Sequence, residues 1–171
     1  MDTIAVIKAR RSIRRYRPVA VPNAVLTDLI DCARLAPTGY NSQPWVFVVV
    51  TDPAVRGQIA DIARYGSFIR QAGACIAVFA RSDAETYVED SCAATENIII
   101  AAGAYGLGTC WVNAYRKSHS QAIEKLLGAP ADYELVTLLA VGYPDEEKKT
   151  AKKPLTDVLR WNHFDGTDAN A

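Results

Sequence analysis

The chain has 171 residues, the length of one ordinary domain, and 50% of them are hydrophobic, which is enough to bury a core. Its formal net charge of zero argues against a general nucleic-acid-binding protein, which needs a basic surface. No apolar run approaches the roughly 18 residues of a membrane span, and the acidic start at Met1-Asp2 is unlike a signal peptide. Neither a nucleic acid nor a membrane is therefore expected as a partner.

Periodic apolar residues, capping residues and prolines predict the helices. They lie over residues 3–10, 22–36, 53–63, 86–105 and 118–127. Asp2 suits the N-cap of the first helix, and Pro37 ends the second. Between these two helices we expect an extended segment over residues 11–17, because Arg17 precedes Pro18 and the residue before a proline disfavours helical geometry.

Continuous apolar runs predict the strands. They lie over residues 45–51, 75–80, 109–114 and 135–143. The uninterrupted run at 45–51 predicts a strand buried on both faces. Helices and strands alternate loosely, so we expect an α+β domain (an α/β sandwich) with a central mixed sheet of about four to five strands flanked by helices.

The domain organisation is expected to be simple. One domain should cover residues 1–165, followed by a flexible tail over 166–171, whose residues are small and polar. After Pro154 the chain is expected to form either a short helix or an extended segment. No repeat or linker divides the sequence.

The cysteines and histidines argue against a disulfide framework and a metal site. Cys32, Cys75, Cys92 and Cys110 lie far apart in apolar runs, without a C-x-x-C pair. This pattern favours buried free thiols in a reducing compartment over disulfides, so we expect a cytoplasmic protein. The two histidines stand at no metal-ligand spacing, and no metal is expected.

The first chemically suggestive segment, residues 10–17, holds five arginines in eight residues. If this segment is extended, Arg10, Ser12 and Arg14 point the same way. Two guanidinium groups and a hydroxyl on one face suit a phosphate and a polar ring system. The alternative is a solvated basic edge, which is the more common meaning of a charge run.

The second segment, residues 36–45, places hydroxyl, amide and phenol groups in a loop just before a strand. The side chains of Asn41 and Gln43 both donate and accept hydrogen bonds, as reading the edge of a flavin or a nucleobase requires. The alternative is ordinary turn chemistry.

Two further segments are less specific. Residues 103–111 are rich in glycine, but they follow a helix rather than a strand, so they are typical of a helix stop and not of a dinucleotide fingerprint. The lysine-rich run at 148–153 is typical of a solvated linker unless it folds back on the arginines to share a phosphate. The sequence holds no G-x-S-x-G, Walker A or H-E-x-x-H motif.

Together these segments resemble the nitroreductase family of FMN enzymes. Residues 10–14 are similar to the family's opening R-x-S-x-R/K, and residues 36–45 are similar to its A-P-S/T-x-x-N-x-Q-P-W loop, which is the more specific match. Residues 90–111, 142–144 and 148–154 are similar to its central helix, its glycine-rich exit and its closing segment. The resemblance therefore spans nearly the whole chain.

The resemblance implies roles for individual residues around FMN. Arg10, Arg11 and Ser12 would bind the phosphate and ribityl region, with Lys152 or Lys153. Arg14 would lie at the pyrimidine edge, where its charge stabilises the reduced ring. The residues expected from the other subunit are Pro37, Thr38, Asn41 and Gln43. Backbone N–H groups around Val112, Asn113 and Ala114 would face flavin N5 or O4. Candidates for the acceptor pocket are Tyr40, Trp111 and Tyr115, for which ordinary core or surface packing is the alternative.

The implied function is an FMN oxidoreductase. It would use NAD(P)H to reduce nitroaromatic, quinone or similar small acceptors by a ping-pong mechanism, in an intertwined C2 homodimer with flavin at the interface. The alternatives are an FMN storage or sensor protein without turnover, and a related flavin chemistry such as reductive dehalogenation or oxygen-driven flavin breakdown.

Two departures from the family pattern bear on this expectation. Only a few residues separate the strand near residue 80 from the helix near residue 86, where longer members insert a segment that covers the flavin. The pocket should therefore be more open. Lys152-Lys153 stands where an arginine is common, so FMN should be held less firmly.

Overall fold

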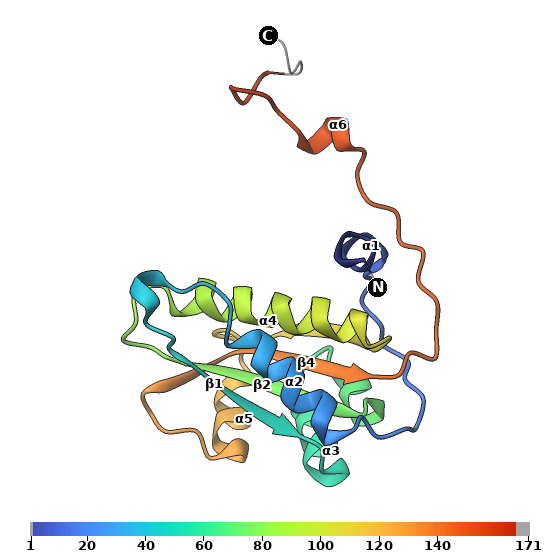
Figure 1. The fold of residues 1–171 in the computed structure, drawn as a ribbon. Helices are drawn as coiled ribbons and strands as arrows, with labels where there is room; N and C mark the ends of the chain where they lie inside the picture. Colours follow the sequence, from blue (N-terminus) through green and yellow to red (C-terminus); the bar gives the residue numbers. More distant parts are fainter. Residues whose placement is uncertain (1, 167–171) are drawn as a thin grey trace.

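The computed structural model describes residues 2–166 and contains one four-stranded sheet in the order β1-β2-β4-β3 (Figure 1). The strands are β1 (Trp45–Val50), β2 (Ala74–Arg81), β3 (Gly108–Asn113) and β4 (Tyr133–Gly142). All four were predicted, and the α+β class is confirmed.

The sheet is antiparallel throughout rather than mixed. A helix joins β2 to β3, and this pattern normally indicates a parallel pair. Here β4 lies between these two strands and pairs antiparallel with both, so β2 and β3 share a direction without being hydrogen bonded. Among the described residues, the one parallel bridge joins Ser12 to Thr109 outside the named strands.

The helices follow the local cues closely. They are α1 (Thr3–Ala9), α2 (Asn23–Ala33), α3 (Pro53–Ile62), α4 (Tyr87–Ala104), α5 (Ser120–Leu127) and α6 (Leu155–Val158), with 3-10 turns η1 (Gly39–Asn41) and η2 (Ser67–Gln71). The carboxylate of Asp2 accepts from the N–H of Ile4 at 3.2 Å and caps α1, as predicted. Gly128, with φ of 71°, ends α5 in the left-handed conformation that glycine adopts readily.

Helices cover both faces of the sheet (Figure 1). On one face α2 and α4 pack over Ile76 and Leu139, and on the other α3 and α5 pack over Leu138. The central strands β2 and β4 are buried almost throughout. The expectation that residues 45–51 are buried on both faces is wrong, because β1 is an edge strand and 45% of Val46 is exposed.

The glycine-rich segment at the end of α4 allows close packing of neighbouring elements. Gly106 has a φ of 70° and turns the chain out of the helix, which agrees with a helix stop. A Cβ on Gly103 would lie 2.7 Å from the side chain of Val6, and one on Gly108 would lie 2.8 Å from that of Ile13. The missing side chains therefore let α1 and the segment after it approach the sheet closely.

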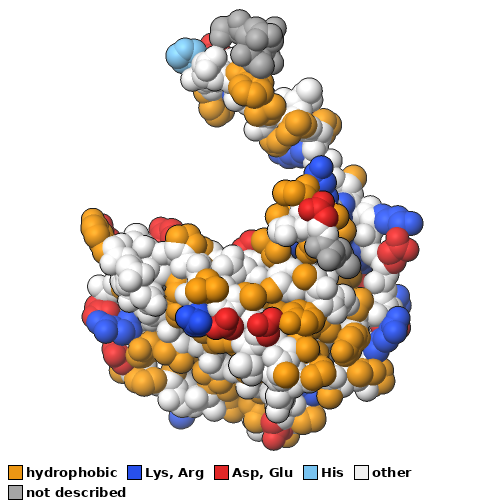
Figure 2. All heavy atoms as spheres, viewed as in Figure 1, with side chains coloured by type: hydrophobic (Ala, Val, Ile, Leu, Met, Phe, Trp, Pro, Cys, Tyr) orange, Lys and Arg blue, Asp and Glu red, His pale blue; other side chains and the backbone are white. Residues whose placement is uncertain are grey.

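The C-terminal segment from about residue 147 leaves the body of the domain and carries α6 past α1 (Figure 1). It exposes apolar side chains, visible above the body in Figure 2. These are Leu155, Val158, Trp161 and Phe164. Of the expected flexible tail over 166–171, residues 167–171 lie outside the described residues, so the domain boundary stays a prediction. In the described part of the chain, no helix is both long and apolar enough to cross a membrane.

Candidate functional site

Residues 10–17 form an arm along the free edge of β3. The N–H of Ile13 donates to the carbonyl of Thr109 at 2.9 Å, and the hydroxyl of Tyr16 donates to the carbonyl of Ile13 at 2.5 Å. Ile13 and Tyr16 are both buried, so they anchor the arm in the core. Arg14 and Arg15, which lie between them, are left exposed at the edge of the sheet, and Arg10 and Arg11 before them are half-buried.

The arm gathers polar groups around the buried thiol of Cys110. Burial raises the pKa of this thiol, while the charge of Arg14, a hydrogen bond from Ser12 and the charge of Arg10 oppose that rise. Arg10, Ser12 and Arg14, which were expected to share one face, therefore all act on the Cys110 thiol of β3.

Glu146 holds the arm from the other side. Its side chain is only 7% exposed, and Oε1 accepts from the N–H groups of Arg14 and Arg15 at 2.6 and 3.2 Å. The hydrogen bond from Arg14 lowers the pKa of Glu146, as does the hydrogen bond from Lys148, whose Nζ lies 3.0 Å away. Glu146 therefore positions the backbone that carries Arg14.

We expect Glu146→Gln to destabilise the protein only at pH values at which Glu146 is ionised. Because folding lowers its pKa, the carboxylate stabilises the folded state above the ordinary value of 4.5, and this stabilisation disappears as the pH falls through the lowered pKa. Urea unfolding from pH 3 to 7 measures the difference in the free energy of unfolding from wild type. Glu147→Gln is the matched control, since Glu147 is exposed and forms its ion pair with the equally exposed Lys149. A pH-independent difference would contradict the prediction.

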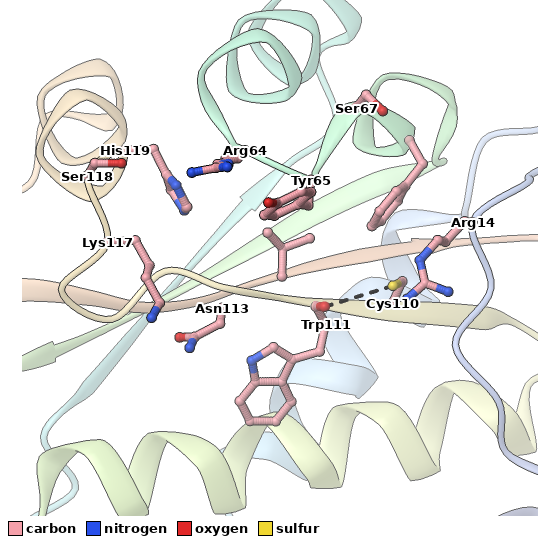
Figure 3. A pocket seen from close by; sticks show the side chains of 12 residues that line it. Arg14, Arg64, Tyr65, Ser67, Cys110, Trp111, Asn113, Lys117, Ser118 and His119 are labelled. Carbon is pink, nitrogen blue, oxygen red and sulfur yellow. Dashed lines mark hydrogen bonds between the residues drawn. The ribbon is translucent and has the colours of Figure 1, made fainter.

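A cavity of about 720 Å³ opens beside the arm. Figure 3 shows side chains from the arm, the end of α3, η2, β3 and the start of α5 pointing into it. Its lining residues are Arg14, Arg64, Tyr65, Ser67, Phe68, Cys110, Trp111, Val112, Asn113, Lys117, Ser118 and His119. None of these is a carboxylate, so the described wall is basic.

The first motif and the end of β3 meet in this cavity. The guanidinium carbon of Arg14 lies 5.8 Å from the ring centre of Phe68, in a cation–π contact that orients it. Val112, Asn113 and Trp111 line the wall, as predicted for residues near the flavin or its acceptor. Their roles toward a flavin stay predictions.

The second motif lies elsewhere, around Asp90 of α4. The Asp90 carboxylate, which is 5% exposed, accepts from the N–H of Gly39 at 3.2 Å and from the hydroxyl of Thr86 at 3.0 Å. Tyr40 and Asn41 have φ values of 53° and 57°, which non-glycine residues adopt rarely. Asp90 thus holds a strained loop in one shape.

Within the loop, several polar groups that were predicted to meet the flavin bond to one another. The amide of Gln43 donates to the Asn41 side chain at 3.1 Å, and the backbone N–H of Gln43 donates to the hydroxyl of Thr38 at 3.4 Å. Pro37, Asn41 and Gln43 are exposed, and Tyr40 is 94% exposed. This loop therefore presents an ordered surface that its own chain does not cover.

The two motifs stand at opposite ends of α4. The loop is tied to the start of this helix through Asp90, while α1 and the arm pack at its end through Gly103 and Thr109. An 18-residue helix is about 27 Å long. One chain alone therefore does not bring the two motifs to the same site.

Five further predicted residues do not line the cavity: Arg10, Arg11, Ser12, Lys152 and Lys153. Arg11 donates to the carbonyls of Lys8 and Thr150, at 2.9 and 3.2 Å, and links α1 to the C-terminal segment. Lys152 and Lys153 follow on that segment and are exposed. Their assignment to a phosphate stays a prediction.

Tyr115 faces a different cluster. Its ring packs edge-on against Tyr87, with ring centres 6.1 Å apart, and Arg116 covers it at 5.0 Å. This agrees with the alternative of ordinary aromatic packing, and the structure does not bring Tyr115 into the cavity.

Five residues of the site were not predicted from the sequence: Arg64, Lys117 and His119 in the cavity, and Asp90 and Glu146, the two carboxylates that hold the motifs. No sequence spacing connects these residues, because they come from different loops that only the packed sheet brings together. That His119 is one of only two histidines was the single available cue.

This arrangement of sheet, helices and edge cavity defines a nitroreductase-like α+β fold. The solved FMN-dependent nitroreductase of Clostridium difficile superposes with a TM-score of 0.89 at 28% identity, over 94% of this chain and 99% of that one.

The chain belongs to the Nitroreductase family, whose sequence profile matches residues 7–67 and 63–143. A protein of Archaeoglobus fulgidus, provisionally named NADH dehydrogenase/NAD(P)H nitroreductase, is 33% identical over 153 residues, covering 86% of this chain and 88% of that protein. An iodotyrosine deiodinase of Thermotoga neapolitana is 27% identical over 183 residues, covering 92% and 96%. The family resemblance is thus confirmed, and the chain is a nitroreductase-family oxidoreductase.

Proposed function

We propose that this protein is an FMN-dependent oxidoreductase that uses NADH or NADPH to reduce small acceptors, such as nitroaromatics or quinones, by a ping-pong mechanism. The observation that carries the proposal is the basic cavity on the β3 edge, which holds Arg14 of the first family motif. The free thiols of its four cysteines suit a reducing compartment, and we place it in the cytoplasm.

The residues present fit FMN. The cavity volume of about 720 Å³ lies within the usual range for small-molecule sites, roughly 300–1,000 Å³. Arg10 and Ser12, at one side of Cys110, would hold the phosphate and ribityl region, and Arg14 would lie at the pyrimidine edge. FMN would supply the electron transfer between donor and acceptor, while these side chains bind and orient it.

A homodimer completes this site. The loop of the second motif contacts α4 at Asp90 and α1 packs on it at Gly103, about 20 Å further along the helix, so in the proposed site the loop comes from a second copy of the chain. Apolar side chains exposed on α1, β1 and the C-terminal segment support such an interface, because they gain from being covered. They include Ile4, Ile7, Val46, Leu155 and Phe164.

The short connection between β2 and α4 bears on the alternatives. Residues 82–86 are all that separates the two elements, and Tyr65 at the cavity is 80% exposed. An open cavity favours small, varied acceptors over a chemistry that requires a covered substrate, such as dehalogenation.

The absorbance spectrum of the purified protein, with the released chromophore identified, tests the cofactor. Oxidation of NADH or NADPH with an added nitroaromatic or quinone then tests turnover. Bound FMN with turnover is the expected result. Bound FMN without turnover on any acceptor would favour a storage or sensor protein, and a protein that binds no FMN would refute the proposal.

Arg10→Ala should lower FMN affinity, because it deletes a charge-assisted phosphate contact worth about 1.5–3 kcal/mol. Fluorescence titration of the flavin-free protein with FMN measures the dissociation constant. Arg17→Ala is a matched control, since Arg17 is an exposed arginine at the other end of the same segment, where it lines a separate pocket with Arg56 and Arg70, whereas the charge of Arg10 acts on Cys110. An equal effect of the two substitutions would remove Arg10 from the site.

Dilution should release FMN in step with dissociation of the dimer, because each proposed site takes residues from two chains. Analytical ultracentrifugation monitored at the flavin absorbance follows both events together. Tight FMN binding by a monomer would contradict the shared site.

A further inference from the structure

His119 is a buried group that the proposed flavin contacts leave unused. It stands at the N-cap of α5 and is 8% exposed, and its Nε2 atom has no hydrogen-bond partner among residues 2–166. An unpaired buried nitrogen is costly, and such groups in native proteins usually have a partner in a ligand or water. Figure 3 shows the imidazole pointing from the start of α5 into the cavity.

Cationic side chains surround the same end of the cavity. Arg64, after α3, and Lys117, before α5, both line it, and Figure 3 draws them at the end that His119 enters, with Arg14 at the opposite end. Neither residue forms an ion pair with any carboxylate among residues 2–166. Two unpaired cations that line one cavity repel each other unless an anion lies between them.

The start of α5 adds to this field. Its first N–H, that of Ser120, donates to the carbonyl of Lys117 at 3.0 Å and holds this loop against the start of the helix, and the N-terminus of a helix favours negative charge. The helix is amphipathic and packed through the buried Ile123, so its end is held in place. All the described groups at this end of the cavity thus favour a negatively charged ligand.

We propose that Arg64, Lys117 and His119 form a subsite for an anionic oxygen group, a carboxylate or a phosphate, on the molecule that exchanges electrons with the flavin. The assignment rests on the proposed function, since that function places the flavin ring beside Arg14 and leaves the other end of the cavity to its reaction partner. The source of the anion is either a carboxylated aromatic acceptor or the phosphate of the nicotinamide donor.

The two histidines of the chain permit a direct test by imidazole NMR of the purified protein with the flavin it retains. His163, on the exposed C-terminal segment, is an internal control. One probe pair is 4-nitrobenzoate and neutral 4-nitrobenzamide. The other is nicotinamide mononucleotide and nicotinamide riboside, which lacks the phosphate. The His119→Asn variant assigns the signals.

The member of one pair that carries the carboxylate or phosphate should shift the His119 signals at a concentration about fivefold lower than the partner that lacks this group, the upper range for a partly exposed ion pair. The pair that responds identifies the source. Lys117→Gln should remove most of this difference, while Lys125→Gln, the same change at an exposed position of α5 outside the cavity, should not. His163 should not respond.

Equal responses to the members of both pairs with and without the anionic group, or no response, would overturn the proposal. A His119 shift caused only by FMN would overturn it too, because His119 would then belong to the flavin contacts. The measurement needs no turnover. If the enzyme is active but the His119 shift is absent, the subsite is refuted and the proposed function stands. If the shift is present but the protein is inactive, the proposed function is refuted and the anion site stands.

Discussion

Asp90→Ala is expected to lower the free energy of unfolding by about 2–3 kcal/mol and to abolish tight FMN binding. The substitution leaves the N–H of Gly39 and the hydroxyl of Thr86 without their buried acceptor. The adjoining residues Tyr40 and Asn41 hold left-handed φ values that ordinary residues leave when nothing constrains them. The loop would then lose the shape that the proposed dimer presents to the flavin.

Glu89→Ala is the matched control for this prediction. Glu89 is the neighbouring acidic residue in the first turn of α4, so both variants lose the same favourable charge at the helix N-terminus. Glu89 is exposed and does not hold the loop. Urea unfolding and FMN titration of both variants separate the two effects, and similar losses in the pair would show that the loop contacts of Asp90 are unimportant.

Gly108→Ala should displace the arm and weaken FMN binding about tenfold, which corresponds to one lost charge-assisted contact. A Cβ at this position would lie 2.8–3.0 Å from three carbon atoms of Ile13, which is itself buried and cannot move aside. We expect a loss of about 1–3 kcal/mol in the free energy of unfolding, as for other overpacked cores.

A double-mutant cycle with Ile13→Ala isolates this steric cause. If the clash is responsible, Gly108→Ala should cost much less in the Ile13→Ala background, because the space that the new methyl group needs is then free. FMN affinity and the free energy of unfolding are measured for all four proteins. Additive effects would mean that Gly108 acts through something other than contact with the arm.

Local sequence signals determined most of the secondary structure of this protein. Asp2 and Gly128 act on the backbone next to them, so the start of α1 and the end of α5 could be predicted without knowledge of the fold, whereas α2 ends at Ala33, before the predicted stop at Pro37. The apolar runs identified all four strands for a similar reason, since burial in the sheet requires them. The two motifs also identified the family, because motif identity is a property of the sequence itself.

Strand order and the candidate site were decided by the tertiary structure alone. No local feature of Tyr133–Gly142 reveals that β4 inserts between β2 and β3, and this insertion makes the sheet antiparallel. Nor does a local feature reveal that β1 pairs with β2 alone and lies at an exposed edge. Arg64 and His119 are distant in sequence and share a cavity only because α3 and α5 cover the same face. Likewise Asp90 and Glu146 hold loops that lie far from them along the chain, and such contacts depend on packing that no residue type or spacing encodes by itself.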